Sequence, residues 1–304
     1  MTMRVYSPDA SSAYDRSMKT FRSRSVRFMR MALICIAAGV LAYLALIVVL
    51  RPSNERDWSP DQARLATALI VGPAIEIRNV RNAHYRSTHD YEVHWEDRRY
   101  DLRQLESVWF VVEPFSTWRG PAHTLVSFGF AGGDFIAISV EIRRQRDESF
   151  SPLRGVLRQY EIAYVIGDER DLIGLRANHR KDEVFLYPVQ TSPESIRALF
   201  VAMLQRANAL AATPEFYNTL TNSCTSNIVD HIELLAPGRI PFSFKTLLPA
   251  YSDDLAFDLS LIATDLSRED YRAAHKINDL ALQYVSSPEF SKRIRRGRAM
   301  QGPE

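Results

Sequence analysis

Cys224 is the residue whose type and position best suit chemistry, because it is the only cysteine outside the apolar N-terminal segment. It follows Asn222 and Ser223, which can cap a helix, and apolar residues recur after it at helical spacing. The sequence therefore predicts a helix that begins near Cys224 and ends near Pro237 and Gly238. In the first turn, the helix dipole and free amides favour a thiolate and can hold an oxyanion. A buried structural thiol is the alternative, although the polar neighbours argue against an inert apolar pocket.

A cysteine nucleophile needs a base, and histidine is the usual one. His231 lies seven positions after Cys224 on the same predicted helix. That spacing corresponds to about 10 Å along the axis, which is too far for a hydrogen bond. His123 is the better candidate, because it begins a strand-like run that is followed by a glycine-containing turn and a second strand-like run.

The register of this predicted hairpin decides which residue faces His123. Apolar residues occupy even positions in both runs, so the numbers of paired residues must sum to an even value. A loop of residues 131–133 places Glu141 directly opposite His123. A loop of residues 132–134 places Arg143 there and Glu141 on the diagonal. In either register, Glu141 and His123 share the less apolar face.

Glu141 is therefore the candidate acid of a Cys224–His123–acid site, in which a carboxylate fixes the imidazole tautomer and supports the imidazolium. The alternative for Glu141 is an exposed acid that pairs with Arg143 or Arg144. The alternative for His123 is a histidine that only begins a strand.

Several motifs in order make residues 56–245 resemble the Lnb N-terminal periplasmic domain family. They are RDW at 56–58, RNVRN at 78–82, AHT at 122–124, SFGF at 127–130, SVEIR at 139–143 and NSCTSN at 222–227. The resemblance implies an α+β fold, with an antiparallel sheet packed with helices, similar to circularly permuted papain-like thiol enzymes. In those enzymes the histidine strand precedes the cysteine helix, and His123 precedes Cys224 here.

The family is named for a bacterial lipoprotein N-acyltransferase, so the resemblance implies a thioester acyl-enzyme. Cys224 would take an acyl chain from a phospholipid and pass it to an amine of a lipoprotein, with His123 as base and then acid. The named acyltransferase carries further membrane spans after the domain, whereas a polar helical segment follows it here. A cell-envelope cysteine hydrolase of amides, peptides or esters is one alternative, and a non-catalytic, membrane-tethered binding module is another. An apolar groove beside Cys224 would favour transfer, and an open polar cleft would favour peptide hydrolysis.

Five polar residues are weaker candidates for substrate contacts. Asn222, Ser223 and Thr225 surround the thiol in sequence. Arg81 and Arg176 could hold a phosphate headgroup through bidentate contacts, with structural salt bridges as the alternative.

Composition excludes other classes of function. His84, His89 and His94 recur every five residues, but neither a helix nor a strand puts that spacing on one face, so we predict no metal site and no cofactor. The net charge of +2 and the lack of a binding motif give no support to a nucleic-acid partner. A single cysteine outside the apolar segment permits no internal disulfide, so Cys224 stays a thiol.

Residues 31–50 carry no charge and are long enough to cross a bilayer core of about 30 Å as a helix. Basic residues predominate before this segment, which predicts a cytoplasmic N-terminus. The sequence therefore predicts a single-pass protein of the bacterial inner membrane, in contact with its lipids, with the main domain in the periplasm. A cleaved signal peptide is the rival interpretation, but residues 51–54 offer no small-x-small cleavage site.

The predicted organisation has five parts. They are a basic cytoplasmic tail (1–30), a transmembrane anchor (31–50), a linker (51–60), a periplasmic thiol-enzyme domain (61–260) and a polar helical tail with a basic end (261–304). The tail is either solvated or in contact with anionic headgroups. Within the domain we expect helices over 61–68 and after Ser192, and strands over 74–79, 108–113, 161–167, 171–176 and 184–189 besides the hairpin.

Overall fold

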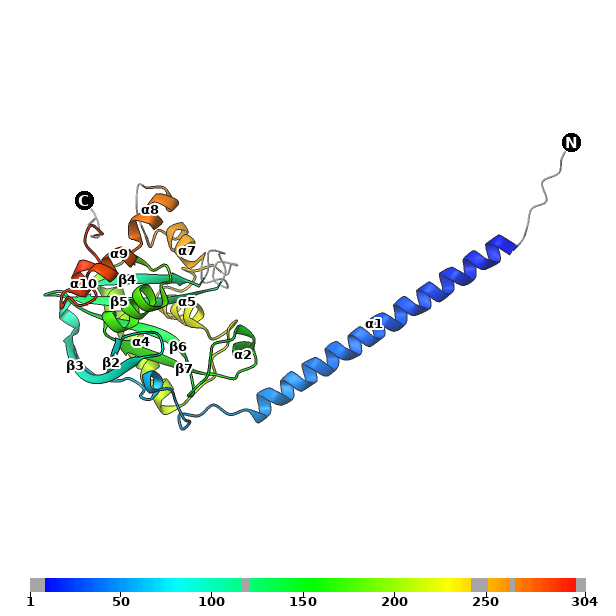
Figure 1. Ribbon diagram of the computed structural model, residues 1–304, viewed down its shortest axis with the longest axis horizontal. Helices are drawn as coiled ribbons and strands as arrows, with labels where there is room; N and C mark the ends of the chain where they lie inside the picture. Colours follow the sequence, from blue (N-terminus) through cyan, green and yellow to red (C-terminus); the bar gives the residue numbers. More distant parts are fainter. Residues whose placement is uncertain (1–8, 116–120, 242–250, 263–265, 299–304) are drawn as a thin grey trace. The chain divides into compact units, whose positions relative to one another are not determined.

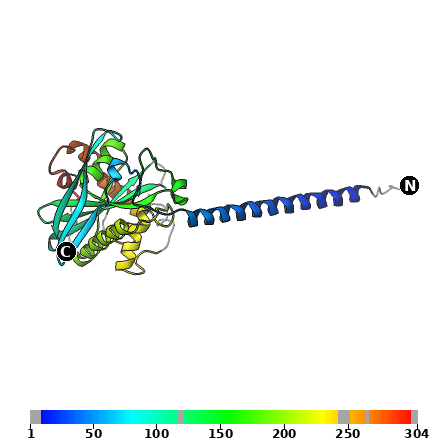
Figure 2. The same ribbon diagram turned by 90° about the horizontal axis from the view of Figure 1, so that it is seen from below.

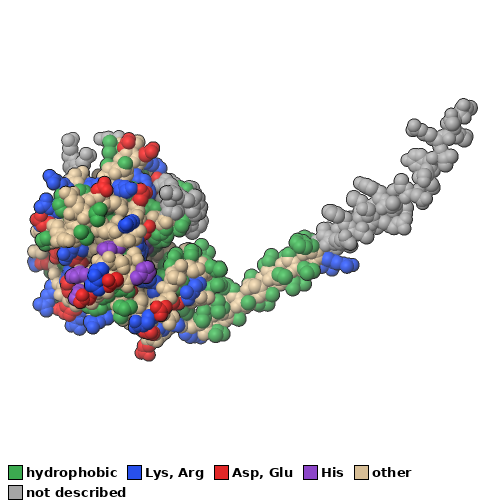
Figure 3. Space-filling model, in the orientation of Figure 1, with side chains coloured by type: hydrophobic (Ala, Val, Ile, Leu, Met, Phe, Trp, Pro, Cys, Tyr) green, Lys and Arg blue, Asp and Glu red, His purple; other side chains and the backbone are tan. Residues whose placement is uncertain are grey.

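The structure is a computed structural model that describes residues 9–115, 121–241, 251–262 and 266–298. The chain divides into two compact units, Met1–Arg51 and Pro52–Glu304. In the first unit the described residues form helix α1 (Asp9–Val49) and the start of the connection that follows it. The stretch Val26–Val49 is long and apolar enough to cross a membrane, and Figure 3 shows hydrophobic side chains along it. It contains nearly all of the predicted span of residues 31–50.

The second unit is built on an eight-stranded sheet with the order β1-β2-β7-β6-β5-β4-β8, in which β3 also pairs with β2. The strands are β1 (Thr67–Val71), β2 (Ala74–Tyr85), β3 (Tyr91–Asp101), β4 (Leu105–Pro114), β5 (Ala122–Phe130), β6 (Asp134–Arg143), β7 (Glu161–Gly167) and β8 (Phe185–Pro188). The β2–β7 contact, Arg81↔Gly167, is parallel, and the other strand pairs are antiparallel. The predicted α+β class, with a largely antiparallel sheet packed by helices, is confirmed (Figure 1).

The β5–β6 hairpin has the register that places Glu141 opposite His123. The paired residues run from Phe130↔Asp134 to Leu125↔Ser139, so the loop is residues 131–133. Gly132 and Gly133 both have positive φ, which glycine adopts without the steric penalty of a Cβ. The strands extend beyond the last pair, so His123 and Glu141 lie just past the point where pairing stops.

Helices α4 (Pro193–Ala212) and α5 (Cys224–Leu235) cover one face of the sheet and lie side by side (Figure 2). The α4 helix begins as predicted, with Ser192 as its cap and proline at its first position. Its apolar stripe packs with even-numbered residues of the hairpin. Members of this cluster include Val126, Phe128, Ile138, Phe200, Met203, Cys224 and Ile228.

The opposite face is covered by α3 (Glu169–Gly174), the π-helix η3 (Leu175–Arg180) and the C-terminal helices α9 (Asn278–Gln283) and α10 (Phe290–Arg293). Their core includes Leu125, Ala137, Ile173, Ala177, Ile277, Phe290 and Ile294. The structure therefore differs from the expected polar tail, because the described part of the C-terminal segment packs on the domain. Its apolar residues are spread over short helices, so they produce no long helical period in the sequence.

Two further predictions were wrong in secondary-structure type. The expected helix over 61–68 is a short 3-10 helix, η1 (Pro60–Gln62), followed by β1. The expected strand over 171–176 is helical, because Asp168 caps α3 by accepting a hydrogen bond from the Arg170 amide. A short apolar run does not distinguish a strand from a buried helix. The remaining described elements are η2 (Leu102–Gln104), α2 (Pro152–Val156), α7 (Ser252–Asp258) and α8 (Arg268–His275).

Candidate functional site

Cys224 is the first residue of α5, and its side chain is buried. Ser223 is the N-cap and forms a reciprocal capping box with Ser226: the Ser226 amide donates to Ser223 Oγ, and the Ser223 amide donates to Ser226 Oγ at 2.7 Å. The amides of Cys224 and Thr225 precede the first intrahelical acceptors, so no carbonyl of the helix satisfies them. The helix start thus presents a thiol together with two backbone donors.

His123 and Glu141 meet at the open end of the β5–β6 hairpin. His123 Nε2 lies 3.3 Å from Glu141 Oε1. Ser139 lies between them, with its Oγ 2.6 Å from His123 Nε2 and 2.6 Å from Glu141 Oε1. Because Nε2 faces this pair, Nδ1 is the ring nitrogen left for the thiol. The predicted contact between His123 and Glu141 is thus present, and the charge of His123 also acts on the Cys224 thiol.

Arg176 reaches the acid from the other face of the sheet. It extends from η3 and is almost fully buried, with Nη2 2.6 Å from Glu141 Oε1 and Nε 2.7 Å from Glu113 Oε2. Glu113 is in turn the cross-strand partner of His123 on β4. Arg176 therefore holds the carboxylate behind the imidazole and does not line the pocket described below.

The electrostatics of the acid follow from this contact. Burial alone would raise the pKa of Glu141, but the charges of His123 and Arg176 and the hydrogen bonds it accepts hold that pKa well below its usual range. Glu141 is therefore a carboxylate at neutral pH and favours a positive charge on His123.

The thiol and the imidazole shift each other in the same sense. Burial opposes a charge on His123, yet the Glu141 and Cys224 charges raise its pKa from 6.5 to about 9. Burial likewise opposes the Cys224 thiolate, yet the His123 charge and hydrogen bond lower its pKa from 9.0 to about 7. Between these two values the site is a thiolate–imidazolium pair, which is the reactive form of a cysteine nucleophile.

His231 does not serve as the base. Its Nε2 lies 2.9 Å from the Tyr164 hydroxyl, and burial lowers its pKa to about 4. The same hydroxyl donates to Asn227 Oδ1 at 3.0 Å, so this network anchors α5 to β7. His231 is thus engaged with Tyr164, in line with the seven-residue spacing that argues against it as the base.

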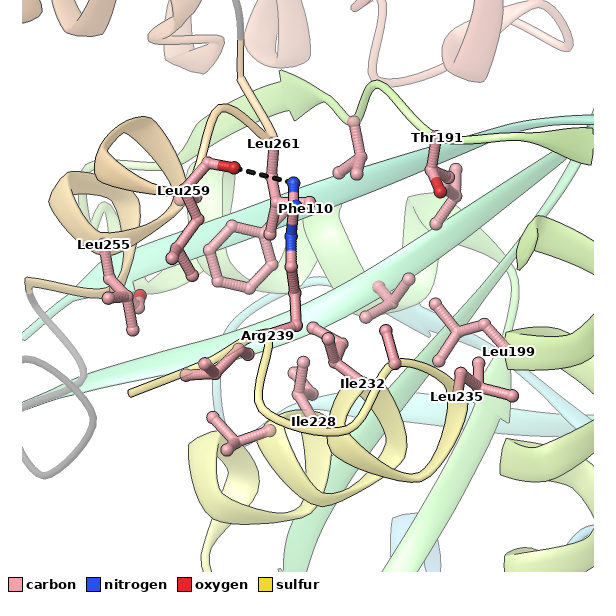
Figure 4. Close-up of a pocket in the computed structure, with 18 of the residues that line it drawn as sticks. Phe110, Thr191, Leu199, Ile228, Ile232, Leu235, Arg239, Leu255, Leu259 and Leu261 are labelled. Carbon is pink, nitrogen blue, oxygen red and sulfur yellow. Dashed lines mark hydrogen bonds between the residues drawn. The ribbon is translucent and has the colours of Figure 1, made fainter. Parts of the chain in front are cut away.

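A cavity of about 300 Å³ lies along α5 (Figure 4). Apolar side chains from α5, β4, β5, α4 and α7 make most of its wall, and Figure 4 shows Phe110, Leu199, Ile228, Ile232 and Leu255 around it. Arg239 crosses the cavity in this view and donates to the Leu259 carbonyl at 2.9 Å. It is the only charged residue among those that line the cavity within the described parts of the chain.

This apolar pocket reaches the immediate neighbours of the thiol. Thr124 and Thr225 both line it, and their hydroxyl oxygens are 3.3 Å apart. Cys224 Sγ lies 3.8 Å from Thr225 Oγ1. Ile228, one helical turn after Cys224, also lines the pocket. An apolar chain in the pocket would therefore have one end close to the Cys224 thiol.

The five weaker candidates for substrate contacts differ in their surroundings. Arg176 pairs with Glu141 and Glu113, as described above. Thr225 is the one that lines the pocket. Asn222 donates to the Phe216 carbonyl at 2.9 Å, and Ser223 is occupied in the helix cap. Arg81 is buried and pairs with Asp171 through Nε at 2.8 Å and Nη2 at 2.8 Å, which is the structural alternative and not a headgroup site.

Sequence reasoning missed Ser139 and Glu113. Ser139 could have been found, because it has the same parity as Glu141 and lies on the same face two residues before it. Glu113 could not, since its place beside His123 depends on the pairing of β4 with β5. Among the residues that the structure describes, no group of three histidine, cysteine or acidic side chains could hold a metal ion.

The comparisons with known proteins bear on this same region. The family model of the Lnb N-terminal periplasmic domain matches residues 91–250, a range that contains His123, Glu141 and Cys224. The motifs at 56–58 and 78–82 precede the match. No curated protein and no solved structure matches the chain. Because the family model covers more than half of the 304 residues, the chain belongs to the Lnb N-terminal periplasmic domain family.

Proposed function

We propose that this protein is a membrane-anchored cysteine acyltransferase, which moves an acyl chain from a phospholipid to an amine of a lipoprotein through a thioester on Cys224. The observation that carries the proposal is the apolar pocket that reaches Thr124 and Thr225 beside the thiol. Apolar walls stabilise an acyl chain by removing it from water, whereas a peptide requires polar partners along its backbone.

The location of the domain supports a lipid substrate. Membership of a periplasmic domain family and one N-terminal apolar helix fit a single-pass membrane protein. The basic residues before the apolar segment favour a cytoplasmic N-terminus and an inner-membrane span. With that topology the domain remains tethered close to a bilayer that can supply the acyl donor.

In the first half-reaction, the Cys224 thiolate attacks the ester carbonyl carbon of the donor. The developing oxyanion accepts hydrogen bonds from the free amides of Cys224 and Thr225. The ester C–O bond then breaks, and the leaving alkoxide takes a proton from the His123 imidazolium. The products are a lysophospholipid and a thioester on Cys224.

In the second half-reaction, an amine attacks the thioester carbonyl, and neutral His123 accepts its proton. The carbon–sulfur bond breaks, which releases an amide and restores the thiolate beside the imidazolium. Glu141, held by Arg176, stabilises the positive His123 that is present before the first half-reaction and again after the second. Water in place of the amine would make the same acyl-enzyme a hydrolase.

The direct test is intact-protein mass spectrometry of the full chain after incubation with phospholipid vesicles. We expect an acyl-sized, hydroxylamine-labile adduct on the wild type and none on Cys224→Ala or His123→Ala. If the wild type carries no adduct while its thiol reactivity still depends on His123, the acyl-transfer proposal fails and a hydrolase of another substrate takes its place.

A pair of tryptophan variants on α5 tests the pocket itself. Ile232 lines the pocket, whereas Leu234 lies two residues further on, is 73% exposed and does not line it. Ile232→Trp should block long-chain acylation while leaving alkylation of Cys224 by a small reagent unchanged. Leu234→Trp, with the same added bulk, should change neither. Equal acylation of both variants would show that the chain binds elsewhere.

A further inference from the structure

Ser139 is a fully buried hydroxyl in the contact between the candidate acid and base. Its Oγ is 2.6 Å from His123 Nε2 and 2.6 Å from Glu141 Oε1, while those two atoms are 3.3 Å apart. A charge-assisted N–H···O bond is ordinarily about 2.7–2.9 Å long. The short connection from acid to imidazole therefore runs through Ser139.

The direction of these hydrogen bonds is determined by what each group can donate. Glu141 is ionised and can only accept, and its Oε1 also accepts from Arg176 Nη2 at 2.6 Å. Ser139 has one hydroxyl proton, so that proton goes to Glu141. Ser139 Oγ is then left as an acceptor, and His123 Nε2 must carry a proton to donate to it. This arrangement leaves Nδ1 as the nitrogen that exchanges a proton with the thiol.

The backbone holds Ser139 in this place. Ser139 forms the last paired position of the β5–β6 ladder with Leu125, immediately before the strands stop pairing. His123 and Glu141 lie beyond this ladder and are held by their outer neighbours instead, His123 by Glu113 on β4 and Glu141 by Ala163 on β7. Ser139 is therefore the last residue of β6 that β5 holds directly beside the two side chains.

We propose that Ser139 is a positioning residue, whose hydroxyl fixes the proton of His123 on Nε2 and couples the Glu141 carboxylate to the thiolate–imidazolium pair. The inference rests on the proposed thiol chemistry at Cys224. In each proton transfer the thiol or leaving group exchanges its proton with Nδ1, and the Nε2–H and Ser139 O–H bonds remain intact.

The test is the pH profile of Cys224 alkylation by iodoacetamide in the full chain, with Cys35 replaced by serine in every variant. Ser139→Ala should move the midpoint of thiolate formation upward and slow alkylation near neutral pH by about three- to tenfold. Ser139→Thr, which keeps a hydroxyl, should restore most of the wild-type profile and provides a second variant if the alanine protein does not fold.

Ser127→Ala is the matched control, because Ser127 is an equally buried serine of the same hairpin whose hydroxyl contacts Glu169 and Arg295. It should leave the pH profile unchanged whatever it does to thermal stability. A folded Ser139→Ala protein with the wild-type profile would overturn the inference. Absence of the acyl adduct on the wild type would instead overturn the proposed function, so the two failures are distinguishable.

Discussion

At the residue scale, the site brings together side chains from both faces of the sheet. Cys224 begins a helix on one face, and Arg176 extends from the π-helix on the other. They act on His123 and Glu141, which occupy the end of the hairpin between them. Because all four are buried or nearly so, water screens their charges weakly, and each charge strongly shifts the protonation of its neighbour.

The first prediction concerns the pH dependence of the thiol. Iodoacetamide should alkylate Cys224 with a midpoint near pH 7, since the His123 charge lowers the thiol pKa to about that value. His123→Ala should move the midpoint towards or above the ordinary value of 9.0, because burial then acts without an opposing charge. The Cys224→Ser variant measures the background alkylation of Cys35, the other cysteine of the chain. An unchanged midpoint in His123→Ala would show that the histidine does not activate the thiol.

The same pKa shifts predict how stability depends on pH. The raised pKa of His123 contributes stability that is complete below pH 6.5 and is lost as pH rises through about 9. The lowered pKa of Cys224 contributes stability that is complete above pH 9.0 and is lost as pH falls through about 7. Both describe one ion pair, so the pair should stabilise the fold most between pH 7 and 9. Urea denaturation of wild type and Cys224→Ser across this range should show a difference that is largest near pH 8.

Much of this residue-scale arrangement could be predicted from the sequence. The parity of the apolar positions placed Glu141 and His123 on one face, and the short glycine-containing turn allowed the register that occurs. The distances between Cys224 and the hairpin could not be predicted, because they depend on how α5 packs on the sheet. The contact between Arg176 and Glu141 could not be predicted either. The sequence predicted a strand over 171–176, and a strand would direct the Arg176 side chain differently from the π-helix that occurs.

At the element scale, the capping box of α5 sets the position of the Cys224 thiol. Ser223→Ala removes one acceptor for the Ser226 amide and should destabilise the fold by about 1 kcal/mol. Alkylation of Cys224 near pH 7 should also slow, because the first turn carries the thiol. Ser192→Ala, which removes the equivalent cap of α4, is the control: it should cost similar stability without slowing alkylation. Equal alkylation rates in the two variants would refute a link between the α5 cap and the thiol.

The C-terminal segment is the second element with a testable role. Arg295 is buried and pairs with Glu169 on α3, with Nη2 2.6 Å from Oε1. Arg295→Ala leaves that carboxylate buried without its partner and should cost roughly 3 kcal/mol of unfolding free energy. Arg296→Ala, at the adjacent exposed position, should change stability by less than about 0.5 kcal/mol in the same urea titration. If Arg295→Ala lowers the unfolding free energy as little as Arg296→Ala, the C-terminal segment contributes little to the stability of the fold.

At the scale of the whole molecule, the sequence predicted the fold class, the N-terminal apolar helix and the order of histidine strand and cysteine helix. It did not predict that helices cover both faces of the sheet. Ile277, Phe290 and Ile294 complete the second layer, but they are spaced among charged residues on short helices. Only tertiary packing reveals that they share one core, since no local period marks them.

The division into two units gives the last prediction. Residues 52–304 form a compact unit with their own core, so this part alone should unfold cooperatively and keep the midpoint for Cys224 alkylation. Acylation from phospholipid vesicles should nevertheless fall by at least about tenfold relative to the reconstituted full chain, because tethering raises the effective concentration of donor around the site. Donor supplied in mixed micelles, which the free domain also meets readily, should reduce that difference. If the free domain is acylated from vesicles as fast as the full chain, the domain must bind the bilayer by itself, and the apolar helix would serve location and not catalysis.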